Sequence, residues 1–280
     1  MYLLNHYFKK NYFKKENTII KVITGLSNFD VNCIIKLVKA AEIGGATYVD
    51  IAANTRIVSF VKSITSLPIC VSSIDPIELY KCSIAGANII ELGNFDSFYK
   101  KNIYFSEHQI LQLAQETKDL IKDKMICVTI PHHLLLQQQI RLALNLQKLG
   151  IHIFQTEGLS TKIIYKNYYK NNNILNSITC AAAALSSTYT LTQYVEVPII
   201  SASGIDLLSS TIAIYYGGSI VGISSALKQY HGIFDMSYYI STMVSSISAQ
   251  ANFLNMCKNW KISLLSNIQL SINSFTTYNR

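Results

Sequence analysis

The sequence has little arginine, few charges and no long apolar run. Only three of its 24 basic residues are arginine, and lysines supply the rest of a formal net charge of +8. Nucleic-acid sites favour the planar fork of arginine, so we expect surface lysines that attract an anionic ligand, and no nucleic-acid interface. No apolar run reaches the roughly 18 residues that a membrane span needs. We therefore expect neither a transmembrane segment nor, because an apolar core is missing near the N-terminus, a secretory signal.

Paired cysteine motifs are also absent. None of the six cysteines forms a CxxC pair, and Cys70 and Cys127 lie inside apolar runs. Such cysteines are typical of small buried side chains in a reducing compartment. No third acid or histidine stands near His132 and His133 at the spacing of a zinc site. The sequence therefore predicts neither disulfides nor a metal centre.

Half of the 280 residues are hydrophobic, while 14% are charged. This balance is typical of parallel strands that are buried on both faces. Eight short apolar runs alternate with helical patterns: 19–24, 48–52, 69–72, 88–92, 125–130, 151–156, 198–202 and 220–224. Eight strand–helix units in one chain predict a single-domain α/β fold, a (β/α)₈ TIM barrel.

The expected barrel covers residues 18–260. Residues 1–17 form an N-terminal extension with the pattern of an amphipathic helix, which would cap the barrel or lie on a membrane surface. Residues 261–280 form a C-terminal tail. The segment 158–177 is a long loop after strand six, either a functional lid or a tolerated insertion.

An internal repeat aligns four of the strands. The strings GATYVD, GANIIE, GIHIFQ and GGSIVG begin at Gly45, Gly86, Gly150 and Gly217. The residues five positions later are Asp50, Glu91, Gln155 and Gly222. Side chains from alternate strands share layers inside such barrels, so we expect these four positions to lie in one layer.

Charged residues inside apolar strands are the strongest local sign of chemistry. Asp50, Glu91 and Lys21 need partners, because an unpaired buried charge costs several kcal/mol. They form either a structural ion network or a catalytic set, with the acids as general base or substrate clamp and Lys21 as an electrostatic stabiliser. A Schiff-base role for Lys21 is disfavoured, because neighbouring acids raise its pKa.

More candidates follow the strands. Glu157 stands at the end of strand six, where barrel enzymes place catalytic acids, and Gln155 shares its face. His132 follows strand five and could exchange a proton near neutral pH. Asn94 and Asp96 follow strand four and could contact a substrate, or they belong to a turn.

Small residues follow strands seven and eight. The candidates for a phosphate site here are Ser201, Ser203, Gly204, Gly222, Ser224 and Ser225. Loops at these positions commonly bind phosphate through backbone N–H groups at a helix N-terminus. Small residues also permit close packing between strands and helices, which is the alternative.

The chain resembles the hypothetical chloroplast reading frame family numbered twenty-three, a plastid and cyanobacterial family of unknown function. The resemblance rests on KVITGLSNFD, GGATYVDIA, LPICVSSIDP, AGANIIELGNFDSFY, VTIPH, QTEG and SASGI. It implies an aldolase-type barrel in the chloroplast stroma, with no established reaction. Ile220 and Ser224 replace glycines of the family pattern, which leaves backbone approach to an anion less free after strand eight.

Together these features favour an enzyme that binds a small phosphorylated ligand, of isomerase, lyase or epimerase type. A non-catalytic ligand-binding or regulatory barrel is the alternative. The same phosphate clamp could hold flavin mononucleotide as a cofactor.

Overall fold

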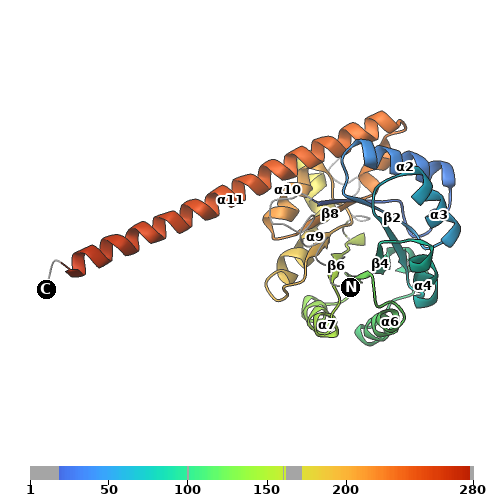
Figure 1. Ribbon diagram of the computed structural model, residues 1–280, viewed down its shortest axis with the longest axis horizontal. Coiled ribbons are helices and arrows are strands. Elements are labelled where there is room, and N and C mark those ends of the chain that lie inside the picture. The colour runs from blue at the N-terminus through green and yellow to red at the C-terminus, as the bar shows by residue number, and fades with distance from the viewer. Residues whose placement is uncertain (1–18, 100, 160, 162–171, 278–280) are drawn as a thin grey trace.

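The computed structural model describes residues 19–99, 101–159, 161 and 172–277 (Figure 1). Within them, eight parallel strands close into a barrel in sequence order. The strands are β1 (Ile19–Ile23), β2 (Tyr48–Ala52), β3 (Ile69–Ser73), β4 (Ile89–Leu92), β5 (Met125–Ile130), β6 (Ile153–Thr156), β7 (Ile199–Ser201) and β8 (Ile220–Ile223). The (β/α)₈ prediction is confirmed, and every strand lies within one or two residues of its expected limits.

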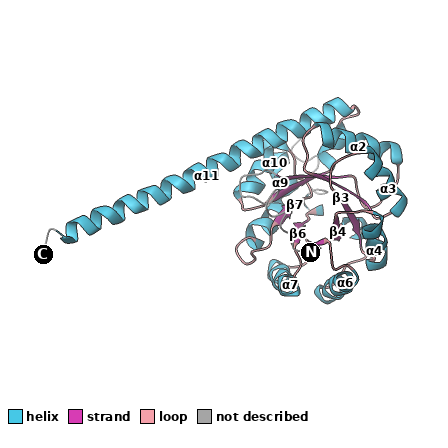
Figure 2. Cartoon of the chain, in the orientation of Figure 1, coloured by secondary structure: helices cyan, strands magenta, loops and turns pink. Residues whose placement is uncertain are grey.

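Helices surround the strands (Figure 2). They are α2 (Val31–Ile43), α3 (Thr55–Ile64), α4 (Pro76–Ala85), α5 (Asp96–Tyr99), α6 (Glu107–Leu120), α7 (Leu136–Leu149), α9 (Asn173–Leu191), α10 (Leu207–Tyr215) and α11 (Ile233–Thr277), with a 3₁₀ turn, η1 (Ser225–Gln229). Asp30 caps α2 by accepting from the Asn32 amide, and Ser106 caps α6 by accepting from the Gln109 amide. Gly86 and Gly150 end α4 and α7 in the left-handed conformation.

Two apolar layers hold the barrel together. The outer layer packs strand residues such as Val22 against helix residues such as Val38. The inner layer fills the barrel with side chains that include Ile23 and Ile200. Strand residues alternate between the two layers, so each strand is buried on both faces, and the continuous apolar runs follow from this.

The expected peripheral segments are described only in part. The whole N-terminal extension, residues 1–17, and most of the 158–177 loop lie outside the described residues. The end of that loop is helical, because α9 begins at Asn173. α11 runs past position 261 to Thr277 and extends beyond the barrel (Figure 1). Among the described residues, no helix combines the length and apolar character needed to cross a membrane.

Candidate functional site

A buried ion network lies inside the barrel around Lys21. Its Nζ atom lies 3.0 Å from Asp50 Oδ2 and 2.8 Å from Gln155 Oε1, and it also contacts Glu91. These four side chains come from β1, β2, β4 and β6 and are at most 2% exposed. The structure thus brings together the strand charges and the glutamine that the repeat places in one layer.

The network is closely satisfied by its neighbours. Ser72 donates to Asp50 over 2.6 Å, and Thr129 and the Gln155 amide donate to Glu91 over 3.0 and 2.7 Å. Burial lowers the pKa of Lys21, but the carboxylates raise it more, so the net pKa lies well above its usual value. Lys21 therefore stays an ammonium ion, which argues against a Schiff-base role.

Gly222 lies beside Lys21 in the β1–β8 register, inside the barrel. A Cβ atom at this position would lie 2.9 Å from the Ala202 Cβ and 3.1 Å from the Ile23 Cδ1. The residue is therefore bare because the inner layer leaves no space for a side chain.

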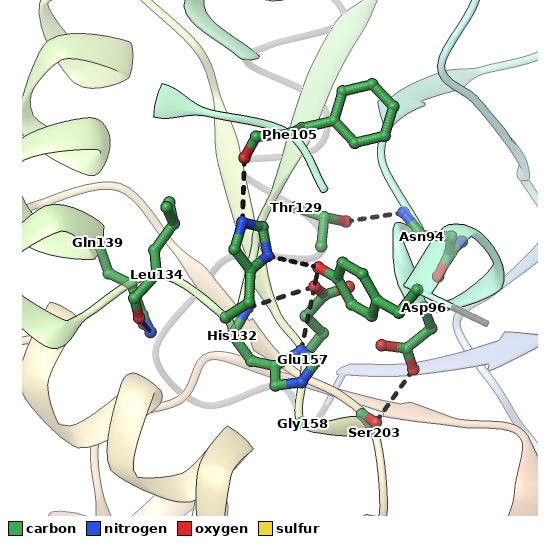
Figure 3. A network of polar contacts seen from close by, with 12 residues as sticks. Asn94, Asp96, Phe105, Thr129, His132, Leu134, Gln139, Glu157, Gly158 and Ser203 are labelled. Atoms are coloured by element: carbon green, nitrogen blue, oxygen red, sulfur yellow. Dashed lines mark hydrogen bonds and ion pairs between the residues drawn. The ribbon is translucent and has the colours of Figure 1, made fainter. Parts of the chain in front are cut away.

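A second polar cluster, the rim cluster, lies at the carboxyl ends of β4, β5 and β6 and consists of Asp96, Tyr99, His132 and Glu157. Figure 3 labels Asp96, His132 and Glu157 of this cluster. Glu157 Oε1 accepts hydrogen bonds from the Tyr99 hydroxyl and, over 3.2 Å, from the His132 amide. The His132 ring faces the same oxygen, with Nδ1 at 3.3 Å. Glu157 is 3% exposed, and its Oε2 has no hydrogen-bond partner among the described residues.

Burial sets the proton affinity of the rim cluster. It raises the pKa of Glu157 to about 7, although hydrogen bonds from Tyr99, His132 and Asp96 lower it. Burial also lowers the pKa of His132 below its usual value, partly offset by Asp96. At neutral pH a neutral imidazole therefore lies beside a carboxyl group that is close to half protonated.

The rim cluster opens onto a cavity of about 330 Å³, the acidic cavity. Asp96 and Glu157 line it together with Asn94, Gln155 and Ser203. Asn94 Nδ2 is buried and has no hydrogen-bond partner among the described residues, so its N–H groups could bind a ligand oxygen. Gln155 connects the cavity to Lys21, but Lys21, Asp50 and Glu91 do not line it.

The loop after β7 differs from the expected phosphate site. Ser203 lines the acidic cavity, and its hydroxyl donates to Asp96 over 3.4 Å. Ser201 points away from the cavity, is fully buried, and shares a 2.7 Å hydrogen bond with Thr188 on α9. The Ser201 side chain is therefore a strand–helix contact and is not placed to bind a ligand.

Gly204 packs against α9 with a φ of 77°. A Cβ here would lie 2.8 Å from the carbonyl carbon of Cys180. We expect Gly204→Ala to lower the free energy of unfolding by about 2–4 kcal/mol, from left-handed strain and overpacking together. Urea unfolding measures this, with Gly45→Ala as the control. Gly45 has a φ of 79°, and a Cβ added there would have no described neighbour within 4 Å. Equal losses in the two variants would contradict the packing role.

The two serines of the loop after β8, Ser224 and Ser225, lie in different surroundings. Ser224 lines the acidic cavity and also a second, larger cavity. Ser225 is the first residue of η1 and, in the described part of the chain, lines neither of these cavities. Of the two serines, only Ser224 is placed to contact a ligand there.

In the part of the chain that the structure describes, two groups of side chains bring metal-ligand atoms within 4.8 Å of one another. In the group of Asp50, Cys70 and Glu91, the Lys21 ammonium lies between the carboxylates and takes the place of a cation. In the group of Asp96, His132 and Glu157, Glu157 Oε1 already accepts two hydrogen bonds. Both groups are organised as hydrogen-bonded networks within the protein.

Sequence reasoning missed two members of the site. Thr129 connects the Lys21 ion network to the loop after β4. Its hydroxyl donates to Glu91 and accepts from the Asn94 backbone amide over 3.4 Å. Tyr99 donates to Glu157 from α5, which is only four residues long. Thr129 could have been recognised as a polar residue within the otherwise apolar strand β5. Tyr99 could not, because no pattern in the sequence distinguishes it from the aromatic residues of the core.

Comparisons with known proteins identify the family. The model of a family described as "Protein of unknown function (DUF561)" matches residues 7–253. The chain belongs to this family. A relative called "Uncharacterized protein ycf23", from Antithamnion sp., is 47% identical over 233 residues, which cover 82% of this chain and 84% of the relative. The expected family resemblance is confirmed.

Solved structures of low sequence identity share the fold of this family member. Thiamine phosphate pyrophosphorylase from Pyrococcus furiosus is 14% identical with a TM-score of 0.54, covering 83% of this chain and 98% of that one. The 3-hexulose-6-phosphate synthase from Salmonella typhimurium is 12% identical with a TM-score of 0.56, covering 82% and 100%. At such identities the likeness establishes the (β/α)₈ barrel fold alone, which hosts many different reactions.

Proposed function

We propose that the protein is an enzyme that transfers a proton on a small phosphorylated substrate, in an isomerase, epimerase or lyase reaction. The observation that carries this proposal is Glu157, a buried carboxyl group that lines a cavity and has a pKa of about 7. A general base works best when its pKa lies near the working pH, and buried carboxyl groups reach that value through desolvation.

The surrounding groups have complementary roles in this proposal. Glu157 removes a proton from a carbon next to a carbonyl group. The Asn94 side-chain amide, whose N–H groups have no hydrogen-bond partner in the described part of the chain, donates to the oxygen on which negative charge develops. Tyr99 and His132 position the Glu157 carboxyl through their hydrogen bonds. The Lys21 network lies beneath Gln155 and stabilises the cavity floor electrostatically.

Two facts support a phosphorylated substrate. The net charge of +8 attracts anions. The barrels of similar fold include a protein named 3-hexulose-6-phosphate synthase and one named thiamine phosphate pyrophosphorylase. We place the protein in the chloroplast stroma, in line with its family and with the reduced cysteines.

Deuterium exchange tests the proposal whichever product the reaction forms. The protein is incubated in D₂O with a panel of triose, tetrose, pentose and hexose phosphates, and proton NMR follows loss of the signal next to the carbonyl group. We expect exchange with at least one member, faster than in a protein-free control. Ligand-induced thermal stabilisation without exchange across the panel would favour a non-catalytic binding or regulatory barrel.

A further inference from the structure

A second cavity, the basic cavity, lies between the loop after β1 and the turn after β8. Its volume is about 590 Å³, and Gly25, Ser27 and Ser224 line both this cavity and the acidic cavity. A ligand that extends past these three small residues would therefore contact both cavities. The rim cluster lies on one side of this junction, and α2 and η1 lie on the other.

The two cavities differ in charge. Lys36, Lys228 and His231 line the basic cavity, and Asp30 is the single acid among the described residues of its lining. Asp96 and Glu157 line the acidic cavity, and no lysine, arginine or histidine joins them among the described lining residues. An anionic group would be repelled by the carboxylates of the acidic cavity and attracted by the cations of the basic one.

The ammonium groups of the basic cavity are available to a ligand. Neither Lys36 nor Lys228 forms an ion pair with a described residue. The Asp30 carboxylate, by contrast, caps α2 by accepting from the Asn32 amide over 3.0 Å. The positive end of the α2 dipole, near Asp30, adds to the attraction for an anion.

A buried hydroxyl group in the basic cavity also points to a ligand. Thr24 lines the cavity, is 5% exposed, and its Oγ1 has no hydrogen-bond partner among the described residues. A buried hydroxyl without a partner is uncommon and costs free energy. An oxygen of a phosphate group in this cavity would accept the Thr24 hydrogen.

We propose that the basic cavity binds the phosphate group of the substrate, with Lys36 and Lys228 as its cationic contacts and Thr24 as a hydrogen-bond donor. The carbon chain then passes Ser224 and reaches Glu157 in the acidic cavity. The identity of the anion as substrate phosphate rests on the proposed function. The anion site itself depends only on the residues that line the basic cavity.

Titration with inorganic phosphate, followed by calorimetry or ³¹P NMR, tests the anion site. We expect the Lys36→Gln/Lys228→Gln double variant to bind phosphate at least about 10-fold more weakly, because hydrogen bonds between two charged groups are stronger than those between neutral groups. Thr24→Val removes a single hydroxyl donor and should bind phosphate about 3–10-fold more weakly. Lys122→Gln, at an exposed lysine on the surface, is the control and should bind as the wild type does. Circular dichroism verifies that each variant is folded.

Two outcomes would overturn the anion site: a wild type that does not bind phosphate, or a double variant that binds it unchanged. If Ser203→Ala weakened phosphate binding and the lysine variants did not, the anion site would instead lie at the loop after β7. Deuterium exchange separates this inference from the proposed reaction. Phosphate binding through the lysines without any exchange overturns the reaction alone, whereas exchange with an unchanged KM in the double variant overturns the anion site alone.

Discussion

Lys21→Met is expected to lower the free energy of unfolding by about 3–5 kcal/mol, the usual cost of removing one partner from a buried ion network. The Lys21 ammonium lies between the carboxylates of Asp50 and Glu91, and both are at most 1% exposed. Without it, two negative charges remain close together inside the barrel. Urea unfolding followed by circular dichroism measures the loss.

The pH dependence of that loss gives a second readout. Burial raises the pKa of Glu91, and Lys21 partly offsets the rise. In Lys21→Met that offset is missing, so the carboxyl group resists ionisation in the fold but ionises freely in the unfolded chain. The destabilisation should therefore be small below the unfolded pKa of about 4.3 and grow as the pH rises above it.

A variant that removes the excess charge is the matched control for Lys21→Met. Lys21→Met/Asp50→Asn/Glu91→Gln has no buried charge in the network and should recover much of the lost stability. Replacement of a whole buried ion network is often close to neutral, whereas breaking one is costly. Equal stability of the single variant and the wild type at pH 8 would show that the ion network does not stabilise the barrel.

The sequence was most informative where burial is complete. Equal distances from the helix-ending glycines relate Asp50, Glu91 and Gln155, because the strand register of a barrel repeats from one unit to the next. Lys21 stands out because a charge in a fully apolar strand is costly. The structure places Asp50, Glu91 and Gln155 around the Lys21 Nζ atom.

Contacts made by loops were much harder to predict. Tyr99 reaches Glu157 from a single helical turn whose direction depends on the whole rim, so spacing along the chain does not reveal the contact. Lys36 and Lys228 resemble ordinary surface lysines in the sequence. They acquire a common cavity only when the first and last units of the barrel close against each other through β1 and β8.

The expected catalytic set divides into two layers with different chemistry. Lys21, Asp50 and Glu91 are satisfied and do not line the acidic cavity, whereas Glu157 lines it. Gln155 joins the layers, since it contacts Lys21 and lines the cavity. A substitution in the lower layer should therefore act mainly on stability, and one at Glu157 mainly on turnover.

Glu157→Gln is expected to lower the rate of deuterium exchange into a reactive sugar phosphate by about 10²–10⁴-fold, the usual contribution of a general base. The amide keeps an oxygen that can accept from Tyr99 and His132 but cannot take up a proton. Phosphate affinity should stay unchanged, because Glu157 lines the acidic cavity and not the basic one. Glu116→Gln, at an exposed helix position, is the matched control and should exchange at the wild-type rate.

The pH dependence distinguishes a lost base from a damaged fold in Glu157→Gln. In the wild type, the rate of deuterium exchange should rise with pH and reach half of its maximum near pH 7, where the Glu157 carboxyl group loses its proton. Burial raises the folded pKa of Glu157 above its unfolded value of about 4.3, so ionisation costs wild-type stability as the pH rises from that value toward 7. Glu157→Gln avoids this cost and should be at least as stable as the wild type at pH 8. A variant that is unstable at pH 8, or that exchanges at the wild-type rate, would rule out Glu157 as the buried base.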